Sequence, residues 1–368
     1  MRTKKITAFI LAICIVVPCM LLVSCSKSPT VMTLDGCKYT EAMYSYWASS
    51  YKGTYMYTYS DITDTAEFWD SEFSDGMTAA EYLDGLTLDA VKNNIAASAL
   101  FKEYKLSFTE EEKQQVDSYI DELIKELGNG SRSEFNKLLG EYGINANILK
   151  SICLEEQKAA KVYEYLYGAG GPMAQNDEDY EKFYKENYIH VQMIYVENIS
   201  TYATDDDGNR VTDENGYYII EELEGEAKEE KDAKVKAVQD GIAGGEDFNE
   251  LYEEYSELKY KNGQYFSHLA SYDDMNFYYG LIAKVENAEI GEIVTVESEM
   301  GTCIMKKLEL DSGAWKNEEN KDFFGDFKSL VSENAYQALI ESYYSNITVD
   351  ESIVKKYSVK NVMPAYFF

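Results

Sequence analysis

The heptapeptide His190-Val-Gln-Met-Ile-Tyr-Val196 decides the fold class, because the helical pattern of the preceding residues ends there and a period of two begins. Successive side chains of a β-strand point to opposite faces of a sheet. Even-numbered residues of the heptapeptide are therefore expected on one face and odd-numbered residues on the other. The segments Val285 to Glu297 and Gly301 to Leu308 supply further strands. The sequence predicts a sheet built around this strand.

Helical patterns lie on both sides of the strand along the chain. Before it, Thr78, Thr109 and Ser131 are each followed three residues later by glutamate, which is the capping box that opens a helix. Apolar residues then recur at helical spacing until Gly168-Ala-Gly-Gly-Pro172 ends the pattern and marks a linker. Another helical pattern covers about 318 to 344. We therefore expect an α+β protein in which a helical module is interrupted by an inserted α+β domain. The expected parts are a helical module at 35–175, the inserted domain at 176–312 and a returning helical segment at 313–368.

The inserted domain contains an acidic insertion at 198–225, which we interpret as a hairpin or a flexible flap. Asp205, Asp207 and Asn209 have the spacing of a calcium loop, but Arg210 occupies the position where that loop needs glycine. No metal site is therefore expected. Helices are expected at about 227–242 and 248–255.

The first 25 residues have the order of a secretory signal. A basic start, Met1 to Lys5, is followed by an uncharged apolar run from Ile6 to Val23 and then by Ser24-Cys25. Leu22 to Cys25 resembles the bacterial lipobox, in which the cysteine is acylated and becomes the new N-terminus. We expect a signal peptide at 1–24, a lipidated tether at 25–34 and a lipid anchor on Cys25 at the extracytoplasmic face of the cell membrane. The alternative is a plain transmembrane anchor, since about 18 apolar residues are just enough to cross a bilayer.

Composition limits the partners. The net charge of −32 becomes more negative when the basic signal is removed, so nucleic acid is not expected as a partner. Such a charge is typical of a solvated acidic surface, and it also suits attraction of cationic segments of unfolded polypeptides or of loosely held divalent cations. Besides Cys25, the processed chain has Cys37, Cys153 and Cys303, whose spacing gives neither a zinc pattern nor a disulfide framework. No cofactor signature is present, and none is expected.

Several short motifs follow one another in an order that resembles exported foldases. The helical part carries Ser133-Glu-Phe135 and Tyr142-Gly-Ile144. The later part carries the heptapeptide, Gly245-Glu-Asp-Phe248 and Gly301-Thr-Cys-Ile-Met305. In this order they resemble PrsA-like and SurA-like proteins, in which a helical chaperone domain is joined to a parvulin-type peptidyl-prolyl isomerase domain. The resemblance implies a helper for the folding of newly exported, unfolded polypeptides.

The resemblance also implies a site. Parvulins interconvert cis and trans X-Pro bonds, whose rotational barrier is about 18–20 kcal/mol. His190 falls at the first histidine position of the family, but the second histidine position holds Cys303. Tyr265, Met275 and Tyr279 fall near the family's apolar clamp for the proline ring. This departure leaves open whether isomerase activity remains. The alternative is a noncatalytic lipoprotein that uses a degenerate parvulin fold as a peptide-binding or assembly module.

Each of the candidate site residues also has a purely structural interpretation. His190 is also compatible with a half-buried histidine that only hydrogen-bonds within the strand. Cys303 is either a thiol partner of His190 or a small core residue. His268 is interpreted as a loop histidine. The 33 tyrosines, dense from Tyr39 to Tyr59, suit either a cradle for loosely structured peptides or core packing. A solute-receptor lipoprotein fits poorly, because alternating βα units are absent from the sequence pattern.

Overall fold

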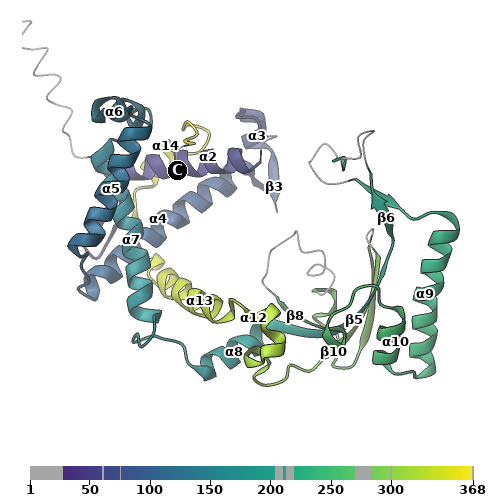
Figure 1. Ribbon diagram of the computed structural model, residues 1–368. Helices are drawn as coiled ribbons and strands as arrows, with labels where there is room; N and C mark the ends of the chain where they lie inside the picture. The colour runs from purple at the N-terminus through teal and green to yellow at the C-terminus, as the bar shows by residue number, and fades with distance from the viewer. Residues whose placement is uncertain are drawn as a thin grey trace, which may run out of the picture. The chain divides into compact units, whose positions relative to one another are not determined.

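The computed structural model describes residues 28–59, 62–74, 76–203, 210–212, 219–269, 283–298 and 301–366. Contacts within the chain divide it into two units, which are drawn in Figure 1. Unit 1 runs to Ala174 and resumes at Ala335, and unit 2 runs from Gln175 to Asn334. A unit with a four-stranded sheet is thus inserted into a mainly helical one, which confirms the predicted α+β class.

Unit 1 is built on long helices whose apolar faces meet in one core. The helices are α2 (Glu41–Thr58), α4 (Ala79–Glu103), α5 (Glu110–Glu126), α6 (Arg132–Gly140) and α7 (Ala146–Tyr167), with the short α3 (Ala66–Asp70) and α14 (Glu351–Lys356). The predicted capping boxes at Thr78 and Thr109 are both present. At Ser131 only half of the box forms, because the side chain accepts from the Glu134 amide without a reciprocal bond. Local sequence therefore sets where these helices begin.

Two small sheets complete unit 1. The first has the antiparallel order β11 (Thr348–Val349), β1 (Thr30–Leu34), β2 (Cys37–Thr40). Asp35 and Gly36, with φ of 48° and 78°, form the two-residue turn between β1 and β2. The predicted tether at 25–34 is therefore too long, because Thr30–Leu34 forms the central strand with Val31 and Met32 buried. The second sheet is the hairpin of β3 (Glu72–Ser74) and β4 (Met77–Thr78).

Unit 2 is centred on β5 (Tyr188–Glu197), which contains the heptapeptide. Its antiparallel sheet has the order β8 (Gln264–His268), β5, β10 (Gly301–Leu308), β9 (Ile293–Ser298). Helices α9 (Gly225–Gly244) and α10 (Phe248–Tyr255) cover the even-numbered face of β5, where Val238 and Leu251 pack around Ile194. The odd-numbered face has its own cluster, which includes Val191 and Met193. The predicted alternation of the two faces is confirmed.

The two ends of the acidic insertion pair as a hairpin, which was one of the two interpretations of this segment. Strand β6 (Ile199–Tyr202) pairs antiparallel with β7 (Ile220–Glu222). The residues with calcium-loop spacing, Asp205, Asp207 and Asn209, lie outside the described part of the chain.

The helical segment at the end of unit 2 differs from its prediction. The helical pattern from 318 to 344 is divided into the one-turn η5 (Glu318–Asn320), α12 (Lys321–Phe324) and α13 (Phe327–Ser342), with η6 (Tyr344–Asn346) after it. Residues up to Asn334 belong to unit 2, whereas the sequence placed the boundary at 312. The reason is an aromatic cluster in which Trp315, Phe324 and Phe327 pack against α8 (Asp177–Asn187) and β5. The remaining one-turn 3-10 helices are η2 (Lys261–Gly263), η3 (Ala283–Val285) and η4 (Ala314–Lys316).

In the part of the chain that the structure describes, no helix combines the length and the apolar character needed to cross a membrane. The expected signal peptide and Cys25 lie outside that part.

Candidate functional site

His190 lies near the start of β5 and is 3% exposed. Its ring stacks on Phe266 of β8 with the ring centroids 4.0 Å apart and the planes 12° from parallel, since the two residues pair across the strands. Its Nδ1 is 2.9 Å from the backbone oxygen of Glu309, so Nδ1 carries the proton and donates it. Nε2 is buried, and no described group meets it at hydrogen-bond geometry. The ring is held as part of the fold.

Burial is the dominant influence on the pKa of this imidazole. Burial lowers the pKa of His190, while the Glu309 carbonyl, the Asp311 charge and the Gln264 side chain act in the opposite direction. A general acid or base must reach the reacting group of its substrate. The described geometry is that of a histidine bonded within the fold, and a catalytic role for it stays a prediction.

Cys303 lies on the other face of the sheet. It pairs with Tyr195 and so belongs to the odd-numbered face, whereas the partner of His190 on β10 is Leu308. At about 3.3 Å per residue, five positions along β10 separate the two by roughly 16 Å. The Cys303 Sγ is fully buried 3.6 Å from the Met193 Sδ, and burial raises the pKa of the thiol to about 12. The structure does not bring His190 and Cys303 together, so the thiol–base interpretation is wrong and the small core cysteine describes what is seen.

The predicted proline clamp is described only at Tyr265. This residue pairs with Val191, which places it on the Cys303 face, and it is half-buried. Its ring centroid is 5.2 Å from that of Tyr260 and 5.1 Å from that of Phe323. Met275 and Tyr279 lie outside the described residues, as does the lipidation candidate Cys25.

His268, interpreted as a loop histidine, instead ends strand β8. Its ring stacks on that of Phe183 with the centroids 5.6 Å apart and the planes 13° from parallel, and burial lowers its pKa. It is part of the aromatic packing of unit 2.

A surface that the sequence did not single out lies in unit 1, where α2 ends beside the β3–β4 hairpin. We call Tyr55, Tyr59, Phe73, Tyr82 and Leu86 the aromatic patch. The Tyr55 ring centroid lies 4.9 Å from that of Tyr59 and 6.3 Å from that of Phe73, and Phe73 stacks on Tyr82 at 4.6 Å. Leu86 follows Tyr82 by four residues on α4 and so lies on the same helix face. Tyr59 is 51%, Phe73 47% and Leu86 40% exposed. Large apolar groups gathered in this way mark binding surfaces.

The patch rests on a polar frame centred on a buried lysine. Lys52, only 2% exposed, donates through Nζ to the Asp64 carboxylate at 2.7 Å and to the Val362 carbonyl at 2.9 Å. The indole of Trp69 donates to the same carboxylate at 2.8 Å, and its ring centroid lies 6.4 Å from that of Tyr55. A buried lysine without these acceptors would be strongly destabilising. The frame therefore fixes the ends of α2 and α3 and the C-terminal segment relative to one another.

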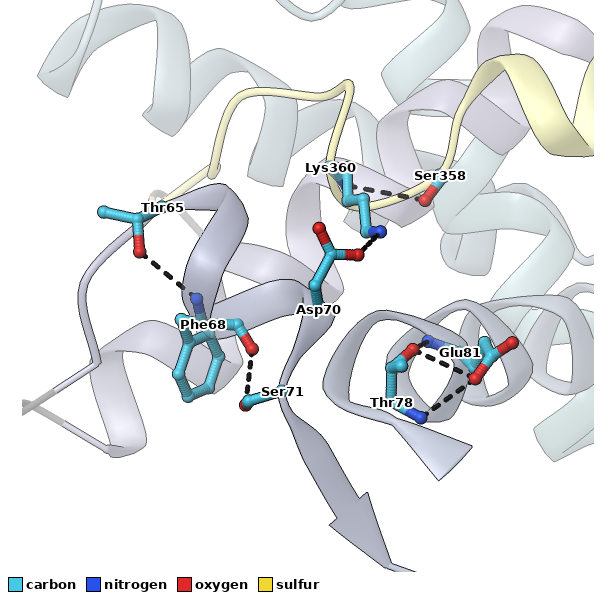
Figure 2. Close-up of polar contacts among 8 residues, drawn as sticks. All are labelled: Thr65, Phe68, Asp70, Ser71, Thr78, Glu81, Ser358 and Lys360. Atoms are coloured by element: carbon cyan, nitrogen blue, oxygen red, sulfur yellow. Dashed lines mark hydrogen bonds and ion pairs between the residues drawn. The ribbon is translucent and has the colours of Figure 1, made fainter. Parts of the chain in front are cut away.

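Helix caps flank the hairpin that carries Phe73, and Figure 2 shows their polar contacts. At the start of α3 the Thr65 side chain accepts from the Phe68 amide at 3.3 Å, and at its end the Ser71 hydroxyl donates to the Phe68 carbonyl at 2.7 Å. Thr78 and Glu81 close the capping box of α4. Lys360 of the C-terminal segment pairs with Asp70. A surface that is already ordered loses little conformational entropy on binding.

The members of the patch are aromatic rings and one aliphatic side chain, which suit contact with apolar segments. In the described parts of the chain, no cluster of three or more histidine, cysteine or acidic side chains could hold a metal ion. Cys37, Cys153 and Cys303 are free thiols.

Comparisons with known proteins give structural likenesses of low identity. No family model matches the chain, and no curated protein does. The solved structure of PrsA from Bacillus subtilis is 17% identical over 79% of this chain and 92% of that one, with a TM-score of 0.23. The foldase protein PrsA from Streptococcus pneumoniae is 16% identical over 77% and 96%, with a TM-score of 0.23. A structure described as PEB4 and Cj1289, two SurA-like chaperones of Campylobacter jejuni, is 12% identical over 88% and 98%, with a TM-score of 0.23. The chain is thus similar to proteins of the kind that its sequence motifs resemble. Because these scores are low, function is argued below from the residues of the chain.

Proposed function

We propose that this protein is a chaperone of newly exported polypeptides and that it holds their apolar segments on the aromatic patch. The observation that carries the proposal is the joined set of rings at Tyr55, Tyr59, Phe73 and Tyr82, exposed at its rim and fixed from below by the Lys52–Asp64–Trp69 frame. Aromatic rings supply much of the binding energy at protein surfaces.

The charge of the chain supports the same role. At a net charge of −32 the protein repels its own copies, which keeps a surface with exposed rings in solution. The same charge attracts segments that combine apolar and basic side chains. The same charge argues against nucleic acid as a partner.

Anchoring is a further part of the proposal. The order of charges and apolar residues before Cys25 supports removal of residues 1–24 and lipid attachment at Cys25, on the outer face of the cell membrane. Mass spectrometry of the protein purified from a membrane fraction tests this directly. An acylated N-terminal peptide beginning at Cys25 is expected, and an intact Met1 peptide would contradict it.

The chaperone claim is tested by aggregation of a chemically unfolded client, followed by light scattering. The double variant Tyr59→Ser/Phe73→Ser removes two exposed rings of the patch. We expect it to lose most of the protection that the unaltered protein gives at equimolar ratio. The matched control is Tyr57→Ser, since Tyr57 is 81% exposed on the same helix but two positions from Tyr55, and so on another face. Full protection by the double variant, or an equal loss in the control, would overturn the proposal.

Peptidyl-prolyl isomerase activity is a second candidate, favoured by the half-buried rings of Tyr260, Tyr265 and Phe323 beside the sheet. An X-Pro bond needs no covalent intermediate, only a site that favours the twisted amide over both planar forms. A protease-coupled assay on a proline peptide measures this activity. The activity is expected to fall in Tyr265→Ala. If no rate above background is found, the sheet serves as a noncatalytic binding or assembly module.

A further inference from the structure

A pocket of unit 1 lies between α2, α5 and α7, the helices labelled in Figure 1, and none of the aromatic-patch residues lines it. Its volume is about 370 Å³. The residues that define its chemistry are Tyr46 and Trp47 of α2, Tyr119 of α5, and Cys153 and Glu156 of α7. The space is at the lower end of small-ligand pockets and holds one large side chain rather than a folded partner.

Three of its nine lining residues are aromatic, two from α2 and one from α5. Tyr46 is only 4% exposed, and its ring centroid lies 6.2 Å from that of Trp47, with the planes at 68°. The Trp47 indole donates to the Tyr39 hydroxyl at 2.6 Å, which fixes its orientation. Tyr119, 42% exposed, stands at the rim. Ring faces arranged around a space attract organic cations through their quadrupoles.

Glu156 supplies the one acidic group of this pocket. The residue is exposed at the mouth, yet the protein around its carboxyl raises its pKa by desolvation. Within the described parts of the chain the carboxylate makes neither an ion pair nor a hydrogen bond, and none of the described lining residues is a lysine or an arginine. The Glu156 charge adds to the desolvation that raises the pKa of Tyr46, Tyr119 and Cys153. The negative potential of the pocket is therefore uncompensated.

Cys153 adds no reactivity. Burial raises the pKa of its thiol to about 11, so the sulfur is protonated at neutral pH and serves as a soft apolar wall. The pocket combines rings and a carboxylate without a nucleophile, which is the chemistry of binding.

We infer that this pocket binds the guanidinium group of an arginine side chain in an extended polypeptide. A guanidinium is planar, stacks on aromatic faces and pairs with a carboxylate through two parallel hydrogen bonds. It is also less strongly hydrated than the ammonium of lysine, so it enters a ring-lined space at lower cost. The inference rests on the proposed chaperone function only for the source of the arginine, which would be an unfolded client; the binding step stands on the pocket itself.

The test uses the purified full chain and two fluorescently labelled, otherwise identical decapeptides rich in glycine and serine. One carries arginine and the other citrulline, which has the same shape without the charge. Fluorescence anisotropy is expected to show the arginine peptide binding about tenfold more tightly. Glu156→Gln should remove that difference and leave citrulline binding unchanged. Tyr119→Ala, a change at an exposed residue, should weaken arginine binding severalfold.

The matched control is Glu126→Gln, which removes the same charge from an exposed residue at the end of α5. Equal binding of the two peptides would overturn the inference. Equal losses of binding in Glu126→Gln and Glu156→Gln would also overturn it, because they would mean that the peptide is attracted to the overall acidic charge. Competition by tetramethylammonium at lower concentration than guanidinium would also overturn it, because the pocket would then fit a rounder cation. The Tyr59→Ser/Phe73→Ser variant should retain the arginine preference, so failure of the pocket and failure of the aromatic patch are told apart.

Discussion

The aromatic patch of unit 1 and the sheet of unit 2 differ in the exposure of the side chains that are candidates for function. In the patch, rings such as Phe73 are exposed on a surface that the ion pair of the buried Lys52 with Asp64 holds from below. In the sheet, His190 and Cys303, which the sequence marked for chemistry, are buried on opposite faces and bonded to their neighbours. Substitutions in the patch should therefore change binding and leave stability intact, whereas substitutions in the sheet should do the reverse.

The largest expected effect comes from disturbing the C-terminal segment that the frame beneath the patch holds. Gly53 faces the C-terminal segment, and a Cβ added there would lie 1.9 Å from the Ala365 carbonyl oxygen. Gly53→Ala must therefore displace residues 358–366, including the fully buried Val359. We expect the free energy of unfolding of unit 1 to fall by more than about 3 kcal/mol, measured by urea denaturation, with early proteolysis of the C-terminal segment.

Gly85→Ala is the matched control for this substitution. Gly85 lies inside α4, as Gly53 lies inside α2, but nothing approaches its added Cβ within 4 Å. The change should stabilise the protein by about 0.5–1 kcal/mol, because alanine loses less backbone entropy than glycine in a helix. Equal midpoints for the two variants would show that the C-terminal segment is not held at Gly53.

The sheet is tested next, by His190→Ala. The substitution removes the stack on Phe266 and the bond to the Glu309 carbonyl, and leaves that carbonyl without its donor. We expect a loss of about 2–4 kcal/mol in the free energy of unfolding, with client protection unchanged at temperatures where the variant is folded. A variant as stable as the unaltered protein but without isomerase activity would place His190 in catalysis instead.

Local signals explain what the sequence predicted well. Thr78 and Glu81 are three residues apart, and the bond between them is decided within one helical turn. The alternation along β5 is likewise local, so its two faces were predicted correctly. The separation of His190 from Cys303 was not predictable in this way, because it depends on the register of β5 with β10, where a shift by one residue exchanges the faces.

The patch shows the same limit. Tyr55 lies in the last turn of α2 and Tyr59 is the C-cap residue four positions later, so their contact is readable from the sequence. Phe73 joins them only because the β3–β4 hairpin folds back beside α2, and the density of tyrosines between 39 and 59 did not separate exposed rings from buried ones. Tyr46 and Tyr57, 4% and 81% exposed, belong to the same dense run. Exposure is a property of the tertiary packing.

Glu181 sharpens the comparison, because it shows how the inserted unit depends on pH. Burial acts to raise its pKa, but hydrogen bonds donated by Ser312, Trp315 and the Gly313 amide outweigh burial and hold the pKa at about 2. A carboxyl with a lowered pKa stabilises the fold above its unfolded value of about 4.3, and this contribution is lost as pH falls toward 2. Glu181→Gln should therefore destabilise unit 2 at pH 7 by about 1 kcal/mol, discounted for its partial exposure.

The measurement for Glu181 is urea denaturation followed by tryptophan fluorescence, since Trp315 lies against this carboxyl. The gap between variant and unaltered protein should close below about pH 4. A gap that stays constant down to pH 2 would mean that the hydrogen bonds do not depend on the charge.

The smallest expected effect is also the one that separates binding from stability. Tyr59→Ser removes a ring that is half exposed and touches Tyr55, and Tyr57→Ser removes one that is almost fully exposed. Both should leave the free energy of unfolding within about 0.5 kcal/mol of the unaltered protein, because neither opens a cavity nor strands a polar group. Only Tyr59→Ser should reduce client protection. If Tyr59→Ser destabilises the protein as much as His190→Ala does, the patch is an outlying part of the core and the contrast between the two regions is lost. If Tyr59→Ser leaves the stability unchanged, a loss of client protection comes from a loss of contact with the client.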